Sequence, residues 1–153
     1  MRYLLVMFVG CTLALAFSGA SATPENVSAL EKFRTATAVS QRLCALSAEH
    51  ALLKAEIERA EKAVTANAYE EIGACIARAK VDAKGAYAKG LAAVARKPAA
   101  ARLLKDYYAA WLASLQSLAP DTSDTKSTWD RRQAEAARRT DEIWTRFEVE
   151  AGL

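Results

Sequence analysis

Apolar residues recur every three or four positions along the N-terminal half of the chain. Together with His50, they form a stripe of Phe33, Ala36, Val39, Leu43, Leu46, His50, Leu53, Ile57, Ala60 and Val64. This spacing is typical of an amphipathic helix with a coiled-coil-like seam. Thr23 and Pro24 supply an N-cap and a first helical residue, so the pattern predicts one helix from Pro24 to about Val64. We expect its stripe to face the core.

A second helix is predicted from Asn67, which would cap it together with Glu70, to about Ala95. Many of its inward positions carry small residues, which favours close approach of a neighbouring helix. These positions are Ile72, Cys75 or Ile76, Ala79, Ala83, Ala86 or Tyr87, Gly90 or Leu91, and Val94.

A third helix is predicted to open at Pro98, because proline suits the first turn of a helix. Its apolar residues fill about half of the helical circumference, so it should touch two neighbours. They are Leu103, Leu104, Tyr107, Tyr108, Trp111, Leu112, Leu115 and Leu118.

A loop over residues 120–128 separates this segment from a fourth helix, which is capped by Ser127 or a nearby Asp or Thr. This helix runs to about Ala151, with Gly152 beyond its end. Its inner stripe is Trp129, Gln133, Ala136, Thr140, Ile143 and Phe147, with Trp144 at the edge. The whole pattern predicts an all-α antiparallel bundle of three to four helices with one long N-terminal helix.

The first twenty-two residues have the pattern of a secretory signal peptide. Arg2 precedes an apolar run from Leu4 to Phe17, and Ala20-Ser21-Ala22 fits the small-residue rule for cleavage. The run is shorter than the ~20 residues that a membrane span needs. We therefore expect residues 1–22 to be cleaved and residues 23–153 to form one exported domain, periplasmic or secreted. An uncleaved anchor and a lipoprotein modified at Cys11 are the weaker alternatives.

Composition supports a folded helical domain, since 52% of the residues are hydrophobic and 25% are charged. The formal net charge of +3 comes from interspersed charges of both signs, not from a basic block. This pattern and the predicted export argue against a nucleic-acid partner. Contact with an anionic membrane surface stays an open alternative, which the arginines of the fourth helix could serve: Arg131, Arg132, Arg138, Arg139 and Arg146.

Cys44 and Cys75 are the two cysteines that would remain after cleavage, and an oxidising compartment favours a disulfide between them. Helix geometry argues against that bond. A hairpin turning near residues 65–68 places Cys75 opposite Glu58, which leaves Cys44 about 20 Å away along the axis. A disulfide needs Cα atoms within about 7 Å. The two arguments balance, and the pairing is left open.

No catalytic or cofactor motif is recognisable in the sequence, and we expect no cofactor and no metal site. His50 is the single histidine, and the residue three positions before it is Ser47, so a Glu-x-x-His metal motif is missing. We expect His50 to be partly buried on the core stripe. An enzyme would need it in a pocket beside a carboxylate.

Aromatic residues concentrate in the second half of the chain, where core packing is the first interpretation. Tyr108, Trp111 and Trp144 could instead line a groove for a lipid or small hydrophobic ligand between the third and fourth helices. Tyr108 and Trp144 lie at the edges of their stripes and should be partly exposed.

The leading functional hypothesis is a non-enzymatic binding or scaffold protein that engages another envelope or secreted protein through a helical face. It requires an exposed apolar patch. The alternative is a carrier that uses the aromatic groove. A seam as long as residues 33–64 could also pair with a second copy, so a homodimer is kept as an open alternative.

Overall fold

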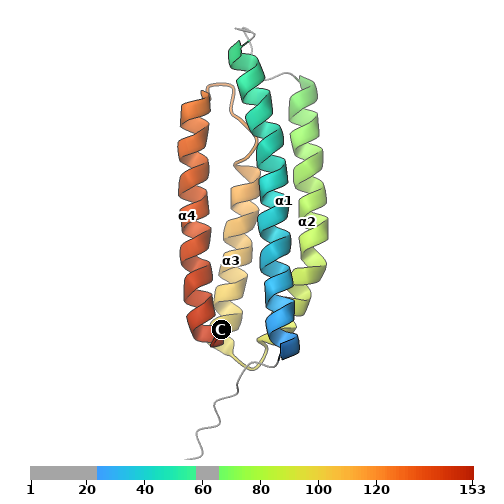
Figure 1. The fold of residues 1–153 in the computed structure, drawn as a ribbon, viewed down its shortest axis with the longest axis vertical. Helices are drawn as coiled ribbons and strands as arrows, with labels where there is room; N and C mark the ends of the chain where they lie inside the picture. The colour runs from blue at the N-terminus through green and yellow to red at the C-terminus, as the bar shows by residue number, and fades with distance from the viewer. Residues whose placement is uncertain (1–23, 58–65) are drawn as a thin grey trace, which may run out of the picture.

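The computed structural model describes residues 24–57 and 66–153, which form an up-down-up-down bundle (Figure 1). Its helices are α1 (Pro24–Ile57), α2 (Ala66–Ala93), α3 (Pro98–Gln116) and α4 (Lys126–Ala151). The predicted all-α bundle with a long first helix is thereby confirmed. The predicted signal peptide and the expected last two turns of the first helix, over residues 58–64, lie outside the described residues.

Local chemistry sets the helix ends. Pro98 opens α3, as predicted. α4 is capped by Thr125, whose hydroxyl accepts the backbone N–H of Thr128, while the Thr128 hydroxyl accepts the N–H of Thr125. Gly152 ends α4 with a left-handed φ of 68°, which glycine adopts without strain. The expected cap at Asn67 is wrong, because α2 already begins at Ala66.

Two helical hairpins make up the bundle. α1 packs along α2, α3 packs along α4, and the two pairs lie against each other. Figure 1 shows α1 projecting beyond the start of α2 at one end of the molecule. Every helix therefore buries one side, and α1 leaves its other side uncovered.

The core consists of two apolar clusters, one toward each end of the bundle. The first surrounds the Cys44–Cys75 pair and contains Trp111, Leu115 and Trp129. The second is aromatic, with Phe33 against the rings of Tyr107 and Trp144 at centroid distances of 5.7 and 6.4 Å. Its other buried members include Leu30, Val94, Leu104, Phe147 and Ala151.

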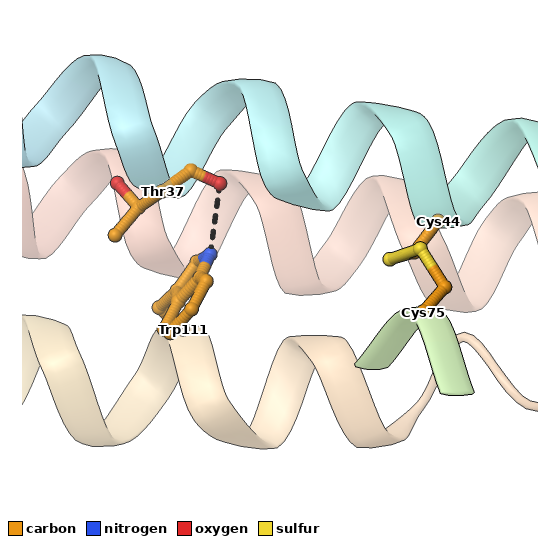
Figure 2. The surroundings of a disulfide bond; sticks show 4 residues. All are labelled: Thr37, Cys44, Cys75 and Trp111. Atoms are coloured by element: carbon orange, nitrogen blue, oxygen red, sulfur yellow. Dashed lines mark hydrogen bonds between the residues drawn. A yellow bond between two sulfur atoms is a disulfide. The ribbon is translucent and has the colours of Figure 1, made fainter. Parts of the chain in front are cut away.

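A buried polar layer lies between the clusters. The Thr37 hydroxyl and the Tyr107 hydroxyl are 2.9 Å apart, and the indole N–H of Trp111 donates to the Thr37 carbonyl at 3.0 Å (Figure 2). Gln41 donates to the Ser114 hydroxyl at 2.6 Å. Because an unpaired buried polar group destabilises a fold, these bonds favour one register of α1 against α3.

An ion pair fastens the loop between α3 and α4. Both terminal guanidinium nitrogens of Arg132 donate to Asp124, at 2.9 and 2.6 Å, and the Asp124 side chain is only 7% exposed. This hydrogen bonding holds the pKa of the Asp124 carboxyl below its ordinary value. The indole N–H of Trp129 donates to the Leu118 carbonyl at 3.0 Å and closes the same loop from within.

The stripe expected to bury α1 is mostly on the wrong side of the helix. Phe33 is buried as predicted, but the buried residues that follow are Thr37, Cys44, Ala48 and Leu52. The leucines and valine that carried the sequence pattern are exposed, and one of them, Leu43, borders a groove between α1 and α2. The physical reason is that small residues let α1 and α2 approach closely, while the larger apolar side chains lie outside this tight contact.

Candidate functional site

Five of the eight large hydrophobic side chains that are exposed in the described structure lie on one side of α1. We define the outer stripe as Val39, Leu43, Leu46, His50, Leu53 and Ile57. Its five apolar side chains are 51%, 58%, 45%, 41% and 79% exposed, in that order, and His50 is exposed among them. Isolated exposed apolar residues are ordinary, but a contiguous row of this kind marks an interaction surface.

The spacing of the outer stripe is that of a coiled-coil seam. Successive members are four, three, four, three and four residues apart, which is the alternation of the a and d positions of a coiled coil. Such a row accepts the side chains of another helix laid along it. The stripe therefore suits a helical ligand better than an extended peptide or a small molecule.

The two borders of the outer stripe differ in charge. The border toward α4 carries Arg42, Glu49 and Glu56, and the border toward α2 carries Ser40, Ser47 and Lys54. Glu49 lies 3.1 Å from the ammonium of Lys126, and Glu56 accepts the backbone N–H of Lys126 at 2.9 Å. These contacts fix both carboxylates beside the stripe.

Lys126 at the start of α4 is the centre of this border. Its ammonium donates to both oxygens of Asp130, at 2.6 and 2.7 Å, and lies 5.7 Å from the centre of the Trp129 ring. The bond to Asp130, followed by the contact with Glu49, raises the pKa of Lys126. The ammonium therefore stays protonated and keeps α4 tied to α1.

His50 differs from its prediction. It was expected to be partly buried on the core stripe, but it is exposed between Leu46 and Leu53. The enzyme hypothesis needs this residue in a pocket beside a carboxylate, whereas the structure places it on the exposed side of α1. Within residues 24–57 and 66–153, no group of three or more metal-binding side chains comes together.

Cys44 and Cys75 form a disulfide with Cα atoms 5.6 Å apart (Figure 2). The geometric argument against this bond fails because the hairpin turns earlier than expected. α1 ends at Ile57, so the chain reverses between Ile57 and Ala66 and not near residues 65–68. Cys44 and Cys75 then lie level. The bond borders a groove of about 470 Å³ between α1 and α2, which also contains Ser40 and Ser47.

The three residues proposed for a ligand groove lie in different surroundings. Trp111 is 1% exposed and Trp144 is 7% exposed, so Trp144 is more buried than predicted. Tyr108 is half-buried and stacks on Tyr87 with ring centres 4.0 Å apart. Burial raises the pKa of the Tyr108 hydroxyl. Trp144 borders a groove between α1 and α4, together with Arg34 and Glu148.

A separate groove of about 650 Å³ does run between α3 and α4. Alanines form much of its floor, at positions 109, 110, 113 and 136, and Ile143 lies beside them. Arg132, Arg139 and Arg146 also line it, with Asp106 and Glu135 among them. Tyr108 and Trp111 lie in the core on the other side of α3, so the sequence prediction selected the buried side of this helix.

The five arginines proposed as an anion-binding face do not share one environment. Arg132 is bound to Asp124, and Arg138 pairs with Glu142 at 2.5 Å one helical turn away. Arg139 and Arg146 lie along the α3–α4 groove, and Arg131 is exposed. Their charges are thus partly matched by neighbouring carboxylates.

Comparison with protein-family models, with curated proteins and with solved structures found no match to this chain. None of the four helices is long and apolar enough to cross a membrane over the residues that the structure describes. The candidate site therefore rests on its own geometry.

Proposed function

We propose that this chain is an exported, non-enzymatic scaffold protein that binds an amphipathic helix along the outer stripe of α1. One observation carries the proposal. Five large apolar side chains are exposed at coiled-coil spacing on a helix whose opposite side is packed against the bundle. The expected exposed patch lies on α1, whereas the apolar residues of α3 contribute largely to the core.

Export is part of the proposal. Its support is the leader pattern of residues 1–22 together with the Cys44–Cys75 disulfide, a bond that persists in oxidising compartments. A disulfide that ties α1 to α2 also suits a scaffold, because it keeps the backbone under the outer stripe rigid. A rigid surface loses less conformational entropy on binding.

Site-specific photo-crosslinking in the exporting cell tests this function. A photoreactive phenylalanine analogue replaces Leu46 in the outer stripe, and the matched control carries it at Val81, which is 73% exposed on α2. We expect a protein adduct at position 46, mapped by mass spectrometry to a helical segment, and none at position 81. Absence of any adduct specific to position 46 would contradict the proposed function.

The carrier hypothesis has one favourable observation, the α3–α4 groove with its alanine floor and arginine lining. This combination suits a slender apolar chain with an anionic head group. A fluorescently labelled fatty acid should gain polarisation on binding the chain if this function is real. This gain should weaken in Ala110→Phe, which fills the groove, and persist in Ala77→Phe on the exposed side of α2. Polarisation that stays at the value of the free label removes this alternative.

A further inference from the structure

We infer that the helix bound by the outer stripe is α1 of a second copy of this chain, running antiparallel. This inference rests on the proposed function and names its partner. In a symmetric pair, a two-fold axis brings the same surface of both copies together, so each contact occurs twice. The stripe must then be complementary to its own reverse.

Side-chain size meets this requirement. In the register centred between Leu43 and Leu46, each of these leucines lies opposite the other in the second copy. Val39 then lies opposite His50, and Ala36, at the half-buried margin of the stripe, lies opposite Leu53. Leu53 thus faces a smaller residue, and Val39 and His50 are of similar size, so side chains can interlock at even spacing over residues 36–53. Beyond them, Ile57 lies opposite the exposed Lys32.

Charge selects the same register. On the border toward α4, Arg42 of one copy lies level with Glu49 of the second copy, and the symmetric contact repeats this pair. Arg42 is exposed and makes no ion pair with the residues that the structure describes. On the border toward α2, Ser40 of one copy lies level with Ser47 of the second copy, and Lys54 lies level with Phe33, which is buried. No like charges meet in this arrangement.

Other arrangements are less favourable. Sliding the antiparallel pair by one heptad pairs Val39 with Ile57, and it brings Arg42 level with Glu56. It also places Glu49 opposite Glu49 of the second copy at the centre of this border, where two carboxylates repel each other. A parallel pair brings Glu49 beside Lys54 but stacks His50 on His50 in the centre of the seam. A polar residue opposite itself at such a position lowers the stability of a coiled coil. The antiparallel register avoids both contacts.

The first experiment measures mass in solution. The oxidised chain, exported and purified without reductant, is run in size-exclusion light scattering over a dilution series. We expect the mass of two copies. Leu46→Lys should weaken association roughly thirty-fold or more, because it places a charge at the centre of the seam. Val81→Lys introduces the same charge at a more exposed position on α2 and should leave the mass unchanged.

The second experiment determines orientation. Val39→Cys and His50→Cys are prepared separately, mixed in equal amounts and oxidised, with the native disulfide retained. The antiparallel register predicts one mixed product that joins position 39 of one copy to position 50 of the other. A parallel pair would instead join 39 to 39 and 50 to 50. Val81→Cys serves as the control and should not form this product with either variant.

The outcomes separate the two proposals. A two-copy mass that Leu46→Lys abolishes, together with the mixed 39–50 product, supports the inference. A single-copy mass at every concentration, a dimer indifferent to Leu46→Lys, or exclusively like-with-like products would overturn it. If the chain is monomeric but the position-46 adduct contains a different protein, the scaffold function stands and only the choice of partner is wrong.

Discussion

At the residue scale, the contact between Asp124 and Arg132 is the clearest case of one side chain holding an element in place. We expect Arg132→Lys to lower the free energy of unfolding by about 1–2 kcal/mol, because lysine cannot make the paired bonds to the carboxylate. Urea denaturation followed by circular dichroism measures this change. Arg131→Lys is the control, since the neighbouring Arg131 is exposed. Equal stabilities of the two variants would show that the paired geometry is unimportant.

Asp124 also predicts how stability depends on pH. Its pKa is lowered in the folded state, mainly by the hydrogen bonds from Arg132, so the ionised carboxylate favours folding. This contribution is fully present above the ordinary aspartate pKa and is lost as the pH falls through the lowered folded value. The stability gap between the wild type and Asp124→Asn should therefore be wide at neutral pH and narrow under acid. A gap that stays constant across this range would contradict the assignment.

Glycine positions give a further residue-scale prediction. An alanine methyl at Gly85 would meet no atom within 4 Å, whereas Gly152 holds a φ of 68°. Gly85→Ala should stabilise the chain by about 0.5–1 kcal/mol. Alanine has less backbone freedom than glycine in the unfolded chain, so less conformational entropy is lost when the helix forms. Gly152→Ala should destabilise it by a similar or larger amount, since alanine is strained in that conformation. Thermal unfolding of both variants checks the opposite signs, and a shared sign would contradict the argument.

At the element scale, the sequence correctly indicated an all-α bundle of three to four helices and most of the helix ends. Where it failed was the rotation of α1. Hydrophobic periodicity favours leucine, valine and isoleucine, and these lie on the outer stripe. The buried side of α1 carries Thr37, Cys44 and Ala48, which are small or polar and leave a weak pattern. The packing of α2 and α3 against α1 determines which side is buried, and that information is absent from α1 alone.

The candidate site was also misassigned because the packing between helices cannot be read from one helix alone. The residues of the outer stripe were identified from the sequence, but as core. The disulfide could not be decided because its feasibility depends on where the first hairpin turns, and no glycine or proline marks that point. The α3–α4 groove is lined largely by alanines, and alanine contributes little to a hydrophobic pattern. Trp111 and Trp144 were recognised as important apolar residues, but their burial follows from neighbours on α1.

The α1–α2 hairpin should depend strongly on the disulfide. The bond closes a sequence separation of 31 residues, for which chain entropy alone predicts about 3–4 kcal/mol of stabilisation. Replacing both cysteines with alanine should lower the free energy of unfolding by that amount, measured by urea denaturation without reductant. Wild-type chain with reductant is the matched control and should lose a similar amount. If neither treatment matters, the bond does not constrain the unfolded chain.

At the scale of the whole molecule, the bundle is complete without the outer stripe. Both core clusters are closed by contacts among the four helices, and the buried polar layer fixes their register. The outer stripe adds nothing to this interior, yet it exposes apolar surface to water. Such a surface is explained when it is covered in the assembled protein, which is the arrangement that the antiparallel pair of α1 helices provides.

His50 gives the assembly its sharpest prediction, because it is the polar member of an otherwise apolar outer stripe. In the antiparallel register it lies opposite Val39 of the second copy, so His50→Leu replaces two imidazoles per dimer with apolar side chains. We expect the dissociation constant to fall roughly tenfold or more, since burying a leucine is more favourable than burying a histidine. Sedimentation velocity over a dilution series measures it, with Val81→Leu on α2 as the control. A weaker dimer in His50→Leu would mean that the imidazole makes a specific polar contact across the seam, and the proposed register would then be wrong.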